Sequence, residues 1–132
     1  MAFSDPWSTR DFAECLASRV PFLVAEERGT GVLAGYAIAH VGGDEGEILN
    51  LGVAPAYRGR GLGRALVERM LAELRGRGAR AVYLEVRESN VVARRLYESL
   101  GFAEVARRAR YYRRPVEDAV VLRNTLAQVA YL

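Results

Sequence analysis

A run rich in glycine and arginine at residues 58–65 has the composition of a phosphate-binding loop. It lies between an apolar stretch that stops at Pro55 and a stretch with helical spacing of apolar residues. Glycines let the backbone approach a ligand without Cβ clashes, and the helix that follows adds the positive end of its dipole. Arginines supply matching charge for a pyrophosphate. The predicted loop residues are Arg58, Gly59, Arg60, Gly61, Leu62, Gly63, Arg64 and Ala65.

The spacing of this run excludes the two commonest phosphate loops. A dinucleotide-binding fingerprint would need glycine where Arg64 stands, and a P-loop would need Gly-Lys followed by Ser or Thr. For the run taken alone, an ordinary strand-to-helix turn with solvent-facing arginines remains the alternative.

Length and composition indicate a single domain covering residues 1–132. Of these residues 51% are hydrophobic, which permits a sizeable core, and the formal net charge is +3. No apolar run approaches the roughly 18 residues that cross a bilayer, and the N-terminus lacks the pattern of a secretory signal. We therefore expect a soluble, cytoplasmic protein that does not engage a membrane.

Cysteine and histidine offer little for metal or nucleophilic chemistry. Cys15 is the only cysteine and lies in a helical-looking context, so we interpret it as a small core residue. His40 is the only histidine and ends an apolar strand. We predict no metal site, because neither residue type is present as a cluster.

Basic and aromatic residues alternate over residues 107–114, a pattern also typical of nucleic-acid-binding proteins. Acidic residues interrupt any continuous basic face, so we expect no direct contact with nucleic acid, although an RNA-associated module remains an alternative. The interrupting residues are Asp44, Glu45, Glu47, Glu117 and Asp118.

The apolar periodicity predicts a mixed α/β (α+β) domain with a largely antiparallel sheet and helices packed across it. The first three strands should form an antiparallel meander. The predicted strands are residues 22–26, 32–40, 47–53, 82–86, 104–107 and 119–122. The predicted helices are residues 11–19, 61–77 and 93–100.

A series of motifs then resembles the GNAT N-acetyltransferases, and within that superfamily the RimI type. The resemblance extends over residues 6–122 and implies a single GNAT-like domain. RimI-type enzymes acetylate the N-terminal alanine of a small-subunit ribosomal protein with acetyl coenzyme A as donor. The same cosubstrate and acceptor peptide are therefore implied here. The motifs are residues 47–55, 58–63, 84–87, 89–90, 96–102 and 117–119.

The resemblance also implies where the cosubstrate lies. In the family, the amides of the pantetheine arm pair with the backbone of the strand before the loop, and one N–H of that strand holds the thioester oxygen as it becomes an oxyanion. The matching oxyanion donor is the N–H of Val53. The implied cosubstrate-binding residues outside the loop are Asn50, Leu51, Gly52, Val53 and Asn90.

Two residues match the family's proton-transfer positions. An α-amine with a pKa of about 8 is mostly protonated near pH 7, so some base must accept its proton. Alternation over residues 82–86 turns Glu85 away from the apolar face, and it matches the catalytic glutamate of RimI-type enzymes. Tyr97 resembles the tyrosine that protonates the leaving thiolate. The alternatives are a solvent-facing glutamate and a core tyrosine. We expect direct attack within a ternary complex.

The acceptor peptide is expected to lie against aromatic and acidic residues. Tyr36, Tyr111 and Tyr112 are predicted to shape its groove. Asp44 and Glu47 could attract a basic peptide, or they could simply solvate a hairpin end. A related enzyme acting on lysine side chains or small amines, and a catalytically weak acyl-coenzyme A binding module, remain alternatives.

The chain departs from the family at its beginning. Only five residues precede Pro6, where the family usually has a first strand and most of a helix. We therefore expect the sheet to lack the usual first strand, which would expose a sheet edge and part of the acceptor groove. Gly52 replaces an alanine common in the family, which should loosen the strand slightly.

Overall fold

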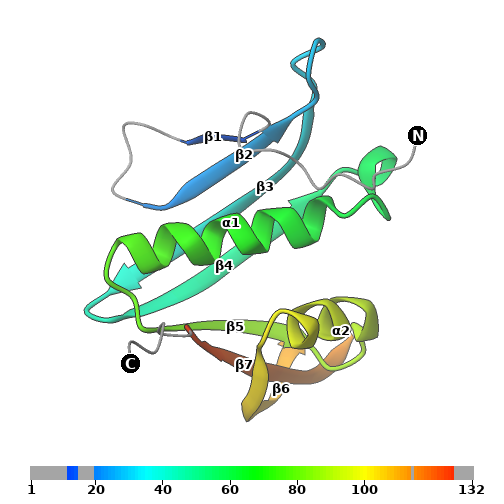
Figure 1. Cartoon of the computed structure of the whole chain (residues 1–132). Helices are drawn as coiled ribbons and strands as arrows, with labels where there is room; N and C mark the ends of the chain where they lie inside the picture. The colour runs from blue at the N-terminus through cyan, green and yellow to red at the C-terminus, as the bar shows by residue number, and fades with distance from the viewer. Residues whose placement is uncertain (1–11, 15–19, 114, 127–132) are drawn as a thin grey trace.

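A computed structural model describes residues 12–14, 20–113 and 115–126 (Figure 1). They form a seven-stranded sheet in the order β1-β2-β3-β4-β5-β7-β6, in which only β4 and β5 are parallel neighbours. The elements are β1 (Phe12–Glu14), β2 (Phe22–Glu26), β3 (Leu33–Gly42), β4 (Glu45–Val53), the 3-10 turn η2 (Pro55–Tyr57), α1 (Leu62–Gly76), β5 (Ala81–Arg87), α2 (Val91–Ser99), β6 (Ala103–Arg113) and β7 (Val116–Thr125).

The predicted mixed, largely antiparallel α/β fold is confirmed. The helix predicted for residues 11–19 is wrong at residues 12–14, the part of it that the structure describes. Residues 12–14 form β1, which pairs antiparallel with β2 and places Ala13 opposite Val24. The rest of the helix predicted for residues 11–19, including Cys15, lies outside the described residues. The edge of β2 offers unpaired backbone groups that an extended segment can satisfy, and helical spacing alone carries no information about such an edge.

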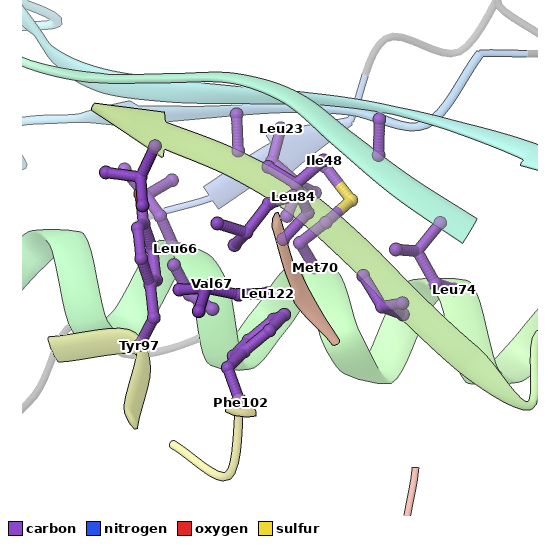
Figure 2. Close-up of a cluster of buried hydrophobic side chains, with 14 of the residues drawn as sticks. Leu23, Ile48, Leu66, Val67, Met70, Leu74, Leu84, Tyr97, Phe102 and Leu122 are labelled. Atoms are coloured by element: carbon purple, nitrogen blue, oxygen red, sulfur yellow. The ribbon is translucent and has the colours of Figure 1, made fainter. Parts of the chain in front are cut away.

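Helix α1 packs on the sheet through one apolar stripe. Leu62, Leu66, Met70 and Leu74 recur at helical spacing and are all almost fully buried. Figure 2 shows Leu66, Met70 and Leu74 spread along the helix beneath the strand residues of the core. Fully burying one such side chain is worth about 1.5–3 kcal/mol, so this stripe fixes the helix and with it the loop that precedes it.

No helix in the described part of the chain is long and apolar enough to span a membrane.

Strands β4 and β5 pair only over their first residues. The last parallel pair joins Glu47 to Tyr83. Beyond it, the register of β4 against β3 shifts by one, because Ile48 and Asn50 face consecutive residues and Leu49 is extra. A bulge of this kind bends a strand and increases its twist. Figure 1 shows β4 and β5 separating beyond this point, so that among the described strands none pairs with the second half of β4 on that side.

The sheet has two chemically different faces. Val82, Leu84 and Val86 of β5 are buried under the helices, while the residues between them turn to the opposite face. We call that opposite face the far face. Its members include Tyr36, Asn50, Gly52, Tyr83, Glu85, Arg87 and Arg108.

The basic and aromatic run lies within β6, so the last two strands are much longer than predicted. Residues 109–111 bulge out between Arg108 and Tyr112, opposite Asp118 alone. Arg110 has a positive φ of 54°, and its N–H donates to Asp118 Oδ1 at 3.0 Å. Arginine and alanine are weak strand signals, so sequence patterning ends this strand too early.

Candidate active site

The glycine loop leads into α1 through left-handed backbone. Gly59 and Gly61 have φ values of 74° and 82°, a region that favours glycine. Gly61 is the N-cap of α1 and has no side chain that could accept from the first-turn N–H groups of Leu62 and Gly63, which lie at the positive end of the helix. This uncapped end fits an anionic diphosphate.

Two of the loop's amides are already used by the chain itself. The Arg58 N–H donates to Pro55 O at 3.3 Å, and the Ala65 N–H donates to Gly61 O at 3.1 Å. The side chain of Leu62 is buried beneath α1. Of the loop predicted at residues 58–65, only residues 59–64 therefore have backbone N–H groups that could donate to a diphosphate.

Arg58, Arg60 and Arg64 are exposed. The contacts of their side chains lie within the loop or at the elements next to it. Arg58 Nε donates to the last carbonyl of β4 at 3.2 Å, and the Arg60 guanidinium lies 5.6 Å from the ring centroid of Tyr57. Arg64 Nη2 donates to Ser99 Oγ, which links the start of α1 to the end of α2.

Tyr57 anchors the start of the loop, and sequence reasoning missed it. Its side chain is buried, and its hydroxyl donates to Oε2 of Glu27, the residue that follows β2. This hydrogen bond raises the pKa of Tyr57, so the phenol stays protonated. No local pattern links these two residues, because they lie 30 positions apart.

The free edge of β4 presents backbone donors toward β5. The Ala54 N–H donates to Ala34 O at 2.8 Å, so it points to β3. In an antiparallel ladder the next residue back points the other way, so the Val53 N–H faces the free edge, and Leu51 does so as well. This is the orientation that an oxyanion donor at Val53 requires. On the far face, the Tyr36 hydroxyl donates to Asn50 Oδ1 at 3.1 Å.

Glu85 lies on the far face and is bonded to an arginine that the sequence did not single out. Arg108 Nη1 donates to Glu85 Oε1 at 2.8 Å. The same guanidinium lies 4.6 Å from the ring centroid of Tyr111, which packs edge-on against Tyr112 at 5.2 Å. The hydrogen bond with Glu85 raises the pKa of Arg108, so this side chain stays a cation. The structure thus brings Glu85 together with Tyr111 and Tyr112, two of the three tyrosines predicted to shape the peptide groove.

A second network continues from Tyr112 toward α2. The Arg87 guanidinium lies 4.1 Å from the Tyr112 ring centroid and donates to Glu117 Oε1 at 2.9 Å. The hydrogen bond with Arg87 lowers the pKa of the Glu117 carboxyl, which also accepts the Ser89 N–H at 3.1 Å. The next residue, Asn90, caps α2 by accepting a first-turn N–H at 3.2 Å.

Tyr97 approaches from the helical face. It is only 8% exposed, and its ring packs edge-on against Phe102 at 5.8 Å. Burial raises the pKa of Tyr97, which keeps its phenol protonated and able to donate. Figure 2 shows the ring extending from α2 beside Leu66. Glu85 and Tyr97 therefore lie on opposite faces of the sheet, because Tyr97 belongs to the core under the helices.

The structure separates the two predicted acidic peptide contacts. Glu47 acts electrostatically on Arg108 and so belongs with the Glu85 group. Asp44 lies in the turn before β4, where its carbonyl accepts the Arg80 N–H at 2.6 Å. It lines a hollow at the other end of the sheet and is not brought to Glu85. Within the described residues, no three His, Cys, Asp or Glu side chains gather as metal ligands would.

The sequence of this chain is similar to those of known acetyltransferases. The profile of the Acetyltransferase (GNAT) family matches residues 1–102. The [ribosomal protein bS18]-alanine N-acetyltransferase of Escherichia coli is 42% identical over 125 residues, which cover 92% of this chain and 82% of the relative. The N-alpha-acetyltransferase RimI of Mycobacterium tuberculosis is 44% identical over 124 residues, covering 91% and 76%.

Solved structures share the fold. The crystal structure of the E. coli ribosomal-protein-S18-alanine N-acetyltransferase matches with a TM-score of 0.74 at 36% identity, over 98% of this chain and 85% of that one. A chain of the NatC complex bound to Gag peptide and CoA matches with a TM-score of 0.73 at 28% identity, over 82% and 71%. The structure of yncA from Salmonella typhimurium with acetyl-CoA matches with a TM-score of 0.73 at 29% identity, over 86% of this chain and 69% of that one. The family profile, the identities above 40% and this shared fold establish that the chain belongs to the acetyltransferase (GNAT) family, in agreement with its motifs.

Proposed function

We propose that this protein transfers the acetyl group of acetyl-CoA to the N-terminal amine of a small-subunit ribosomal protein whose first residue is alanine. Its support is the activity named for the E. coli and M. tuberculosis relatives, which align over nine-tenths of the chain. The structural observation that carries it is the free edge of β4, which leads into the uncapped start of α1 and lies across from Glu85.

Acetyl-CoA would supply an activated acyl group and a diphosphate handle. The N–H groups of residues 59–64 bind the diphosphate, with the loop arginines adding charge. The pantetheine amides pair with the free edge of β4, where Leu51 and Val53 present backbone donors. This binding brings the thioester carbonyl to the point where β4 and β5 part.

Acetyl transfer then needs two proton movements. The amine nitrogen attacks the thioester carbon, and the carboxylate of Glu85 takes the proton that the nitrogen loses. The Val53 N–H donates to the carbonyl oxygen as negative charge develops there. The C–S bond breaks, and the buried phenol of Tyr97 protonates the departing sulfur. The nitrogen–acyl bond replaces the thioester directly, with no acyl-enzyme.

The acceptor peptide would lie on the far face. Tyr36 borders β4, and Tyr111 and Tyr112 border Glu85 through Arg108, so aromatic walls flank the amine position. Glu47 lies near the same cluster and would attract a basic peptide.

A mass-spectrometric assay with three peptides tests this proposal. The first begins with alanine and lacks lysine, the second has a blocked N-terminus and one lysine, and the third begins with a bulky residue. We expect acetylation of the first alone with acetyl-CoA present. Acetylation of the lysine peptide would instead favour a side-chain acetyltransferase, and tight binding of CoA without turnover of any peptide would contradict the proposal.

A further inference from the structure

The proposed base on the far face is already paired with a cation of its own chain. Arg108 Nη1 lies 2.8 Å from Glu85 Oε1, within the reach that an incoming ammonium would need. The Arg108 side chain is 55% exposed, whereas that of Glu85 is 22% exposed. The guanidinium therefore covers the carboxylate from the side that a dissolved acceptor approaches.

Arg108 is held at this position without being buried. Its guanidinium lies 4.6 Å from the ring centroid of Tyr111, and Glu47 attracts it electrostatically. The bulge at residues 109–111 begins directly after it and is fixed by the Asp118 carboxylate. These contacts can keep the cation beside Glu85 even when the carboxylate accepts a second partner.

We propose that Arg108 controls the ionisation of the acceptor amine and so sets acceptor affinity and the pH range of turnover; this inference rests on the function proposed above. Two cations beside one carboxylate repel each other, so Arg108 disfavours the ammonium form of the bound amine. The neutral form is the one that attacks. Without Arg108, an ammonium would pair with Glu85, which gives tighter but less productive binding.

Other charged and titratable groups on this face do not replace Arg108. Arg87 is paired with Glu117 at 2.9 Å, and Arg123 lies 5.8 Å from the ring centroid of Tyr83. The groups that share the far face around Glu85 are His40 from β3, Glu47 from β4, Tyr83 and Arg87 from β5, Arg108, Tyr111 and Tyr112 from β6, and Glu117 and Arg123 from β7.

Steady-state pH profiles of three variants test this assignment. R108Q removes the charge, R108K keeps a charge, and R113Q removes a charge from an exposed position of the same strand that alternation turns to the opposite face. Each is assayed with acetyl-CoA and an alanine-initiated peptide from about pH 6 to about pH 9, which brackets the pKa of an α-amine.

For R108Q, we expect KM for the peptide to fall several-fold at pH values below the α-amine pKa. We also expect kcat to fall, and the acidic limb of its pH profile to move up by about half to one pH unit. R108K should largely restore the wild-type limb, and R113Q should match wild type. A loss of kcat in R108Q with an unmoved limb and an unchanged or higher KM would overturn the inference. Absence of turnover in wild type would instead defeat the proposed function.

Discussion

The ring of Tyr36 occupies the space that any side chain at position 52 would need. A Cβ built on Gly52 would lie 2.8 Å from Tyr36 Cζ and 3.0 Å from its Cδ1. The two residues face each other across β3 and β4, and the Tyr36 hydroxyl also holds Asn50. The glycine thus does more than loosen the strand, because it lets an aromatic wall of the far face lie directly against the strand proposed to pair with acetyl-CoA.

Gly52→Ala should displace the Tyr36 ring. We expect a loss of unfolding free energy of about 1–3 kcal/mol, typical of overpacking, and a several-fold rise in KM for the peptide. Urea unfolding and steady-state kinetics measure both. Gly76→Ala is the matched control, because a Cβ there meets nothing within 4 Å. The double variant Gly52→Ala/Tyr36→Ala should lose less stability than the two single changes added together, and strict additivity would contradict the steric account.

Glu85→Gln should remove the proton acceptor while keeping the size of the side chain. We expect kcat to fall by roughly 10²–10⁴-fold, the usual contribution of general base catalysis, with the Kd of CoA nearly unchanged. Calorimetric titration with CoA and single-turnover acetylation separate the two quantities. Glu98→Gln, at an exposed position of α2, is the control and should be silent. Wild-type turnover by Glu85→Gln would remove this residue from the mechanism.

Tyr97→Phe should lower kcat at least about tenfold if the phenol protonates the leaving sulfur. The ring packing against Phe102 is retained, so stability should change little. Because burial raises the pKa of Tyr97, its phenol remains a donor throughout the neutral range, and wild type should show no loss of kcat from this group below its ordinary pKa of 10.0. An unchanged kcat in the variant would argue for a purely structural tyrosine.

Sequence patterns predicted most of the scaffold, because helices and strands leave a periodicity among residues that are close in the chain. The apolar stripe of α1 and the alternation in β5 are set by neighbours a few residues apart, and both were found in the structure. The glycines at positions 59 and 61 indicated a loop that can approach a ligand closely, and the structure adds that both have left-handed backbone. The edge strand β1 and the full length of β6 depend on pairing with other strands, so patterning did not find them.

The arrangement around Glu85 depended on contacts distant in sequence. Its partner Arg108 lies 23 residues away and reaches it across β7, which lies between β5 and β6 in the sheet. The bulge that follows Arg108 is fixed by Asp118, which the sequence analysis names as part of the motif at residues 117–119 and as an acidic interruption of a basic face, but not as a partner of this strand. Strand order and bulge position are tertiary properties, and no spacing rule within a single strand reports them.

Arg110→Gly should stabilise the protein. Arg110 has a φ of 54°, where a residue with a Cβ is strained by about 1 kcal/mol relative to glycine. Glycine gives the unfolded chain more conformational entropy and so offsets part of this strain relief, and we therefore expect a net gain in unfolding free energy of about 0.5 kcal/mol or less. Arg113→Gly, in the same strand, has no such strain to relieve and should be destabilising. Equal destabilisation by both changes would contradict the strained geometry.

Glu117→Gln should reveal the acid sensitivity of the network next to α2. Its carboxyl has a lowered pKa because it accepts from Arg87 and Ser89, so its stabilising effect exists above the unfolded value of 4.5 and is lost as pH falls through the folded pKa. The difference in unfolding free energy between wild type and variant should therefore shrink in acid. A difference that stays constant from neutral pH down to about pH 3 would exclude this linkage.

A crystal structure of this protein with bound acetyl-CoA would locate every part of the cosubstrate at once. We expect the diphosphate on the N–H groups of residues 59–64, the pantetheine arm along the free edge of β4, and the thioester oxygen at the Val53 N–H. Acetyl-CoA bound elsewhere, or bound with its diphosphate away from the start of α1, would contradict this binding mode.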